Sequence, residues 1–520
     1  MLTYIVPLGE KIVKLIYLLE ILNTFIFLLH FLTLYAIISP EIMKRTEKME
    51  KITGFIEKFK KKFIGTKEFY AGVLAIVIPM IIQNGISNFV NLLDNIMVGS
   101  LGTEQMSGVA IVNQFAFVFL LLVFGAVSAA GIFTAQYHGK GDADGVRYTF
   151  RAKLIINTIV GIIGVLVFLI FDEQFINLFL HESDSTGDLA LTMECGKEYL
   201  KWLVIGLIPF AISQVYASTL RETGNTVVPM AASISAVVTN LILNALLIYG
   251  LWIFPELGVA GAAIATTISR FVELTILVIY THSNSDKCYF INGVFKNFYI
   301  PKELMQKIAV KGLPIMANEF LWSLSVTIRN QSYATRGLDV VAAVNIAFTI
   351  INLMNVVFLS LGSSIAIIVG NKLGAGKIEE AKDSAYKLIA FSVFGAACMG
   401  ILQMAIAPFF PMIYETSDNV KYLATFIIIA SACAVPFNAF AHASYFTLRS
   451  GGRVLETFLF DAGYAWVAVI PTAFILANFT ELGFKSIFIA VLIVEALKCI
   501  MGVVIVKKEK WAKQLTISEN

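Results

Sequence analysis

Residues 78–102 read IPMIIQNGISNFVNLLDNIMVGSLG, and this stretch decides the fold. Asp94 is its single charged residue, and a helix needs about 20 mostly apolar residues to cross a bilayer. At about 100° per residue, the polar side chains of such a helix gather on two adjacent stripes. One stripe holds Gln83, Ser87 and Asp94, and the other holds Asn84, Asn88, Asn91 and Asn95. Because lipid cannot satisfy polar groups, this face must contact protein or water.

The whole chain has the composition of a protein for which lipid is the main solvent. Of its 520 residues, 58% are hydrophobic and 14% are charged, whereas a soluble chain carries about 25% charged residues. So few charges could not cover a water-soluble protein of this size. The formal net charge of +3 is too small to indicate a nucleic-acid partner. We therefore expect an all-α polytopic membrane protein.

Twelve stretches are long and apolar enough to form the membrane-spanning core. The first six are Phe69–Met97, Val109–Ala135, Leu154–Phe171, Tyr199–Leu220, Val227–Ile253 and Val259–Tyr280. The second six are Pro314–Ala334, Val340–Val369, Leu388–Phe410, Tyr422–Leu448, Phe458–Ala477 and Ile487–Val506. These stretches predict an N-lobe at 69–282 and a C-lobe at 314–506, with a cytoplasmic linker at 283–313 and a cytoplasmic tail at 507–520.

Residues 1–68 are predicted to be an N-terminal extension with one apolar helix and a basic cytoplasmic linker at Lys44–Lys67. The apolar stretch Leu15–Ile38 is long enough to span, although it contains Glu20 and His30. It has no small-residue cleavage site, which argues against a removed signal peptide. We expect this stretch to span the membrane as an added helix, with an interfacial helix as the alternative.

The distribution of Lys and Arg predicts the orientation, because cytoplasmic connections carry an excess of basic residues. With the Lys44–Lys67 linker inside, alternate connections hold most of the 39 basic residues. The connections on the opposite side hold only Lys197, Arg336, Lys421 and Lys485. We expect a multi-pass protein of the plasma membrane with a cytoplasmic C-terminus.

The two halves of the chain form an internal repeat at a constant shift of 235 residues. This shift places the following pairs in register: Pro79 with Pro314, Asn95 with Asn330, Gly102 with Gly337, Ser128 with Ser363, Gly139 with Gly374, and Gly141 with Gly376. An even number of spans per half means that both repeats enter the membrane from the same side. They are parallel repeats around an axis along the membrane normal, which favours a transporter.

Six motifs follow one another along the chain: the 78–102 stretch, TAQYHGKGDADGVR at 134–147, TNLILNALLIYG at 239–250, ELGVAGAAIATTISR at 256–270, GLPIMANEFLWS at 312–323 and VGNKLGAGKIEEA at 369–381. In this order they resemble the multidrug and toxic compound extrusion (MATE) family. The resemblance covers roughly residues 68–510. It implies two six-helix lobes that open alternately to each side. It also implies export of amphipathic, often cationic, organic compounds in exchange for Na⁺ or H⁺.

Asp94 is the sharpest candidate for ion coupling. A charged side chain at the bilayer centre costs about 2.5–3.5 kcal/mol on insertion scales, so such residues usually face a bundle interior. Burial favours protonation of a carboxylate, and clustered oxygens bind hard cations. The resemblance implies that Asp94 acts with Asn240, Asn244 and Thr266. Many members have Asp where this chain has Asn244, which leaves the choice between Na⁺ and H⁺ open.

The second half offers three charged candidates for coupling or substrate binding, namely Glu319, Arg329 and Asp461. Arg329 occupies the repeat position of Asp94, so we consider a pair between the lobes as one role for it. The alternative for all three is neutralisation of another buried charge. Polar side chains that could line a substrate cleft are Gln83, Asn84, Asn345 and Asn352. Hydrogen bonding between neighbouring helices is the alternative role for Asn345 and Asn352.

A secondary antiporter is the leading hypothesis, and a lipid-linked oligosaccharide flippase of related fold is the alternative. A flippase would need a wide cationic cleft for pyrophosphate, whereas the membrane-embedded charges here are mostly acidic. GxxxxGK[ST] does not occur, and the scattered histidines suggest no metal-ligand set, so we do not expect an enzyme. We expect no cofactor and no metal apart from a coupling ion, H⁺ or Na⁺, and a monomer in the lipid bilayer that binds a small organic substrate.

Overall fold

The computed structural model describes residue 57 and residues 60–177 and 188–516, and these residues are almost entirely helical. Six long helices come from the first half: α3 (Lys67–Gly99), α4 (Thr103–Lys140), α5 (Ala143–Ile170), α7 (Leu189–Glu222), α8 (Val227–Ile248) and α9 (Gly258–Ser283). The second half contributes α10 (Lys302–Ala334), α11 (Leu338–Gly374), α12 (Ile378–Ile406), α13 (Asp418–Ser450), the pair α14 (Val454–Phe458) and α15 (Ile470–Phe479), and α16 (Phe484–Lys507). Short helices complete the connections: α6 (Asp172–Asn177), η2 (Tyr289–Ile291) and η3 (Phe410–Ile413).

Each of the twelve predicted spans corresponds to one of these helices or to the α14–α15 pair. Within the described residues, eleven helices are long and apolar enough to cross a membrane. The twelfth is α10, whose sequence includes Glu319, Arg329 and several Asn and Ser residues, so it has fewer apolar side chains. The predicted N-terminal span at Leu15–Ile38 lies outside the described residues.

The prediction for the fifth span was too long at its second end. The predicted span reaches Ile253, but α8 ends at Ile248. Gly250 and Trp252 follow with φ of 62° and 63°. A left-handed backbone ends a helix, and it is uncommon for a bulky residue such as Trp252. The apolar side chains of this loop therefore extended the hydrophobic signal past the true helix end.

The two halves have separate hydrophobic cores. One core joins helices from α3 to α9 and includes Phe119, Phe150 and Tyr216. Another joins helices from α10 to α16 and includes Ile350, Ile427 and Phe488. We call these two sets of helices the first bundle (α3–α9) and the second bundle (α10–α16).

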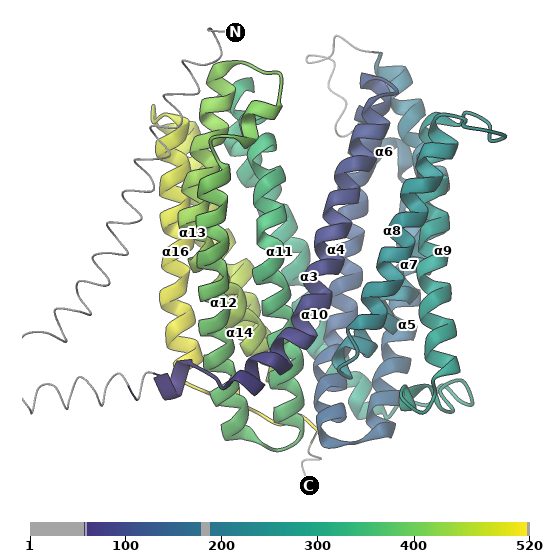
Figure 1. Cartoon of the computed structure of the whole chain (residues 1–520), viewed down its shortest axis with the longest axis vertical. Coiled ribbons are helices and arrows are strands. Elements are labelled where there is room, and N and C mark those ends of the chain that lie inside the picture. Colours follow the sequence, from purple (N-terminus) through teal and green to yellow (C-terminus); the bar gives the residue numbers. More distant parts are fainter. Residues whose placement is uncertain (1–56, 58–59, 178–187, 517–520) are drawn as a thin grey trace, which may run out of the picture. The chain divides into compact units, whose positions relative to one another are not determined.

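The first helix of each bundle packs across to the other bundle. Val73 and Val77 of α3 belong to a core cluster made mainly of second-bundle residues, and the later part of α3 packs against α8. Figure 1 shows α3 (purple) running from the second bundle towards the first. In the same way, Leu304 and Ile308 of α10 pack with Phe133 of α4. The two crossings follow the sequence repeat, since α10 corresponds to α3 and α11 corresponds to α4.

The eleventh span is irregular. Between α14 and α15, the backbone forms two π-helical segments, Leu459–Gly463 and Ala465–Val469. Single π-turns within α-helices occur often at functional sites. Asp461, one of the candidate residues, lies in the first of these segments.

Candidate functional site

The candidate ion-coupling residues of the first half come together around Asp94. Asp94 lies near the end of α3, Asn240 and Asn244 lie on α8, and Thr266 lies on α9. A spacing of four residues places Asn240 and Asn244 on the same face of α8. The Asn244 side-chain nitrogen donates to Asp94 Oδ1 at 2.6 Å. The helices α3 and α8, which are distant in sequence, therefore meet at one carboxylate, and Thr266 of α9 contacts Asn240 beside it.

The Asn240 amide also faces this carboxylate. Because an ionised carboxylate only accepts hydrogen bonds, the side-chain nitrogen of Asn240 must point towards Asp94. In that orientation it donates to the two Asp94 oxygens at 3.0 and 2.9 Å. The Asn240 oxygen then accepts from Thr266 Oγ1 at 3.2 Å. Both Asp94 oxygens are thus held by neutral amide groups.

One buried polar atom beside Asp94 has no hydrogen-bond partner among the described residues. It is the side-chain oxygen of Asn244, which is 1% exposed. No Lys or Arg of the described residues forms an ion pair with Asp94, and Arg270, which acts on it electrostatically, pairs with Glu273 at 3.6 Å. A cation could be coordinated by carboxylate and amide oxygens here. A proton on Asp94 would also neutralise the site.

Tyr199 of the first bundle lies beside this site, and it was not among the predicted residues. Tyr199 of α7 is buried, and its hydroxyl donates to Asn113 Oδ1 of α4 at 3.3 Å. The Asp94 carboxylate acts electrostatically on the Tyr199 hydroxyl. A single Tyr within an apolar span carries no sequence signal of such a role.

Glu319 forms a buried polar cluster in the second bundle. Its carboxylate accepts from the Tyr445 hydroxyl at 2.8 Å and lies 3.6 Å from the Arg449 guanidinium. Arg449 also donates to the Tyr445 hydroxyl at 3.0 Å and stacks over Phe124 of α4. Gly125 of α4 packs against the same turn of α10. Glu319 is therefore paired within its own bundle, close to the crossing of α4 and α10.

Asp461 is the second acid of this bundle, and Asn318 of α10 is its link to Glu319. The Asn318 side chain donates to Asp461 Oδ2 at 3.0 Å and accepts from the backbone N–H of Ala462 at 3.1 Å. Lys498 of α16 forms an ion pair with Asp461. The π-helical segment around Asp461 is thus fixed by α10 and α16, and Asn318 and Lys498 were not among the predicted residues.

Arg329 does not form the pair between the lobes that its repeat position suggested. Its guanidinium pairs with Glu495 of α16, within the second bundle. The reason is local, since Glu495 lies midway along the apolar helix α16 and needs a cation there. The repeat positions 94 and 329 therefore carry opposite charges with different partners.

The four candidate cleft residues are not gathered into one cluster of side-chain contacts. Asn84 donates to Ser360 Oγ of α11 at 3.1 Å, so it joins the two bundles at the α3 crossing. Asn345 and Asn352 are exposed on α11, and Gln83 is half-buried on α3. Within the part of the chain that the structure describes, no three His, Cys, Asp or Glu side chains group as a metal site.

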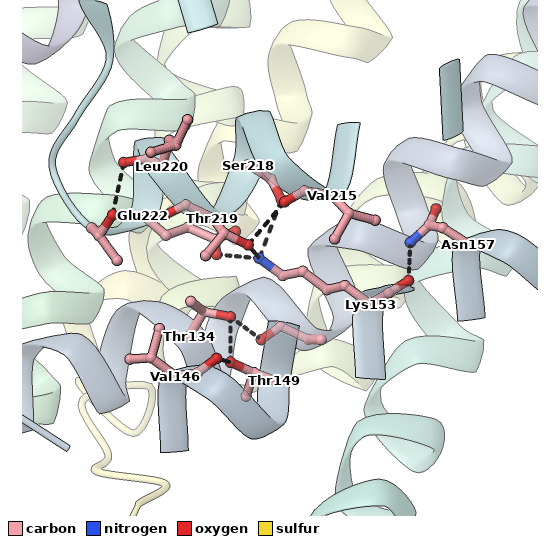
Figure 2. Close-up of polar contacts among 12 residues, drawn as sticks. Thr134, Val146, Thr149, Lys153, Asn157, Val215, Ser218, Thr219, Leu220 and Glu222 are labelled. Atoms are coloured by element: carbon pink, nitrogen blue, oxygen red, sulfur yellow. Dashed lines mark hydrogen bonds and ion pairs between the residues drawn. The ribbon is translucent and has the colours of Figure 1, made fainter. Parts of the chain in front are cut away.

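A second buried ion pair lies in the first bundle and was not predicted. Lys153 of α5 is completely buried and pairs with Glu222 at the end of α7. Figure 2 shows the Lys153 ammonium among Glu222, Ser218 and Thr219, and the two hydroxyls lie 3.2 and 3.1 Å from it. Because the partners lie about seventy positions apart in the sequence, their pairing could not be read from spacing alone.

Comparisons with known proteins agree with this architecture. The family model described as MatE matches residues 79–246 and 314–475. The probable multidrug resistance protein NorM of Halalkalibacterium halodurans is 24% identical over 411 residues, which cover 79% of this chain and 88% of that protein. The multidrug resistance protein MdtK of Pectobacterium atrosepticum is 24% identical over 407 residues, which cover 78% of this chain and 86% of that protein.

Solved structures show a similar fold. A crystal structure of MATE in complex with MaL6 superimposes with a TM-score of 0.76 at 20% identity and covers 86% of this chain and 100% of that one. An outward-facing conformation of a multidrug resistance MATE family transporter of the MOP superfamily superimposes with a TM-score of 0.76 at 20% identity. The match covers 84% of this chain and 96% of that one. These likenesses establish the twelve-helix core.

Proposed function

Since the chain belongs to the MATE family of multi-pass membrane transporters, we propose that it is a secondary antiporter that exports amphipathic, often cationic, organic compounds in exchange for H⁺ or Na⁺. Members of this family are transporters rather than enzymes. The relatives are named as multidrug resistance proteins, which supports a drug-like organic substrate for this chain as well.

The surroundings of Asp94 carry the proposal. This carboxylate is held by two neutral amides, from Asn240 and Asn244, and not by a described Lys or Arg. Its charge can therefore be compensated by an exchangeable ion. The buried oxygen of Asn244 without a partner supplies a second ligand for a cation. Thr266, which bonds to Asn240, completes the proposed ion-coupling set.

Coupling requires that the ion and the organic substrate prefer different conformations of the two bundles. Asp94 lies on α3, and α3 also packs against the second bundle. A proton or Na⁺ at Asp94 would change the hydrogen bonds between α3 and α8. That change can alter how α3 crosses between the bundles. We propose this helix as the element that transmits ion binding to the opening of each side.

We also propose the acids of the second bundle as coupling or substrate-binding residues, with less support than Asp94. Glu319 and Asp461 share Asn318 as a common neighbour, but each also has a basic partner in Arg449 or Lys498. Arg329, which is neutralised by Glu495, is proposed to have a structural role. For the cleft we propose the exposed Asn345 and Asn352 of α11, with Gln83 and Asn84 of α3 at its margin.

The flippase alternative is less well supported. A pyrophosphate-binding cleft needs free cationic side chains, but four basic residues of the described helices are paired with acids. Arg329 pairs with Glu495, Lys498 pairs with Asp461, Arg270 pairs with Glu273, and Lys153 pairs with Glu222. We propose a plasma-membrane location with the C-terminus in the cytoplasm, from the distribution of basic residues. The lobe bounds 69–282 and 314–506 stay predictions, as does the monomeric state.

Ion-driven transport in proteoliposomes tests the proposal. The purified chain is reconstituted, and export of a fluorescent organic cation is measured under a pH gradient or a Na⁺ gradient, imposed separately. We expect Asp94→Asn to reduce gradient-driven transport at least about tenfold. Asp339→Asn is the matched control, because Asp339 is an exposed acid that also accepts a hydrogen bond from an asparagine, Asn419.

A second variant distinguishes Na⁺ from H⁺ as the coupling ion. Asn244→Asp adds a second carboxylate beside Asp94, so a Na⁺-driven transporter should gain Na⁺ sensitivity, whereas an H⁺-driven one should not. If Asp94→Asn transports as well as the wild type under both gradients, the assignment of Asp94 is wrong. Movement of a lipid-linked sugar without any ion gradient would instead support the flippase.

A further inference from the structure

The ends of α4 and α11 touch through their backbones in a symmetric way. A Cβ added at Gly139 would lie 1.9 Å from the Asn371 carbonyl oxygen, and a Cβ at Gly374 would lie 1.9 Å from the Gln136 carbonyl oxygen. The repeat shift of 235 carries Gln136 onto Asn371 and Gly139 onto Gly374. Only glycine allows such an approach. We call this side of the molecule, where α4 and α11 end, the tail side.

The segment 508–516 after α16 runs along the tail side, from the second bundle towards the first (Figure 1). Its beginning is anchored to the second bundle. Trp511 is 0% exposed, and Arg453 donates to the Lys510 carbonyl at 3.0 Å. Glu509 pairs with Lys382 of α12 at 3.1 Å. We call residues 508–516 the strap.

The end of the strap is anchored to the first bundle. The side chain of Gln136, which is 0% exposed, donates to the Lys513 carbonyl at 3.2 Å and accepts from the Leu515 N–H at 2.6 Å. Lys140 donates to the Thr516 carbonyl at 3.1 Å. Gln136 also donates to the Ser450 carbonyl at the end of α13 at 3.0 Å. Its completely buried amide therefore bonds both to the strap and directly to the second bundle, and breaking these bonds is costly.

Leu515 adds an apolar contact where the two bundles meet. Its side chain packs against two small core clusters on the tail side. One cluster contains Phe133 of α4 and Ile308 of α10, and the other contains Ile132 of α4 and Ile315 of α10. Gln514, one residue earlier, donates to the Gly374 carbonyl of α11 at 2.8 Å. The strap therefore contacts the ends of both repeat-related helices, α4 and α11.

We propose that the strap is a conformational lock that favours the state in which the tail side is closed. This inference rests on the proposed alternating access. Opening the tail side separates α4 from α11. The strap continues from α16 of the second bundle, so that motion must release Gln136 and Lys140 of the first bundle and withdraw Leu515. The strap thus sets how readily the transporter opens on the tail side.

Distance measurements between the bundles test the lock without requiring transport. Spin labels are placed at Asp144→Cys and Glu379→Cys, which are repeat-equivalent, exposed and at the starts of α5 and α12. The five native cysteines are replaced beforehand. Double electron–electron resonance in nanodiscs then gives the fraction of molecules with a long tail-side distance.

Three variants weaken the lock: Leu515→Ala, Gln136→Ala and a chain that ends at Lys513. Each should raise the open fraction about tenfold relative to the closed one. Lys513→Ala is the control within the strap, because that side chain is exposed and only its carbonyl is used. Gln403→Ala is the control for Gln136, because Gln403 is equally buried but bonds to Ile428 within the second bundle.

Unchanged distance distributions in Leu515→Ala and Gln136→Ala would overturn the lock. Should the shortened chain fail to fold, these two point variants still decide the question. Transport is measured separately on the same samples. A strap effect on the distances in a chain that shows no gradient-driven export would refute the antiporter and leave the lock intact. Normal export with no strap effect would refute the lock alone.

Discussion

The buried pair of Lys153 and Glu222 predicts a large and separable effect on stability. The Lys153 side chain is 0% exposed and that of Glu222 is 12% exposed, so both charges lie largely away from water. Removing one partner of a buried pair costs about 3–5 kcal/mol, because the remaining charge is left uncompensated. Replacing both partners with apolar residues of similar volume is often close to neutral.

Three variants turn this reasoning into numbers. Glu222→Leu leaves Lys153 with only the hydroxyls of Ser218 and Thr219, so we expect a loss of about 3–5 kcal/mol in the free energy of unfolding. Lys153→Met leaves the slightly exposed Glu222 without its partner. We expect a loss of about 3 kcal/mol in the free energy of unfolding, at the lower end of the same range. The double variant should recover most of this loss and fall within about 1–2 kcal/mol of the wild type.

Equilibrium unfolding in mixed micelles, followed by helical circular dichroism, gives the free energies for the double-mutant cycle. Glu173→Gln is the control, because Glu173 and Lys197 form an exposed pair with side chains 60% and 40% exposed, and exposed pairs contribute little. The reasoning is refuted if the double variant is no more stable than the less stable single variant. It is equally refuted if Glu222→Leu is as stable as the wild type.

Two further predictions concern the contacts between helices. Gly374→Ala places a Cβ 1.9 Å from the Gln136 carbonyl oxygen, so the tail side should no longer close. Distance measurements between the bundles should then show a predominantly open population, and a closed distribution would contradict the role of the glycine contact. Asn318→Ala removes the hydrogen bonds to Asp461 and to the Ala462 N–H. Thermal unfolding should therefore show a loss of about 2–3 kcal/mol in the free energy of unfolding. A stability equal to that of the wild type would show that the π-helical segment does not depend on Asn318.

Helix number and order could be predicted from sequence because apolar length is a local property. Each span was found, but several helices begin well before the predicted apolar stretch, as α10 does at Lys302 where the prediction began at Pro314. Polar first turns hide these helix starts, whereas at Gly250–Trp252 apolar loop residues extended the predicted span beyond the helix end. The sharing of α3 and α10 between bundles could not be predicted in this way. It depends on which apolar faces meet in space, and Val73 and Val77 look like any other lipid-facing valines in the sequence.

The candidate site was likewise predictable only in part from the sequence. Asn240, Asn244 and Thr266 were placed with Asp94 by family resemblance, and their distances support that grouping. Tyr199 and Asn318 were missed, since one polar residue in an apolar helix has no spacing pattern. The strap was also missed, because its sequence was interpreted only as a basic tail, whereas its main contacts use backbone carbonyls and buried side chains.

The repeat itself explains why one carboxylate is different from the others. The shift of 235 places Asp94 and Arg329 at equivalent positions, but the two charged side chains have different kinds of partner. Arg329 meets Glu495 and is fixed as an ion pair. Asp94 meets two neutral amides from α8, whereas Glu319 and Asp461 each have a basic partner in the described structure. A fixed pair gains little from a bound ion, but a carboxylate held by amides gains much. The two bundles are therefore similar in architecture but not in charge at this position, and this difference is why we propose the first bundle as the place where an exchangeable ion binds.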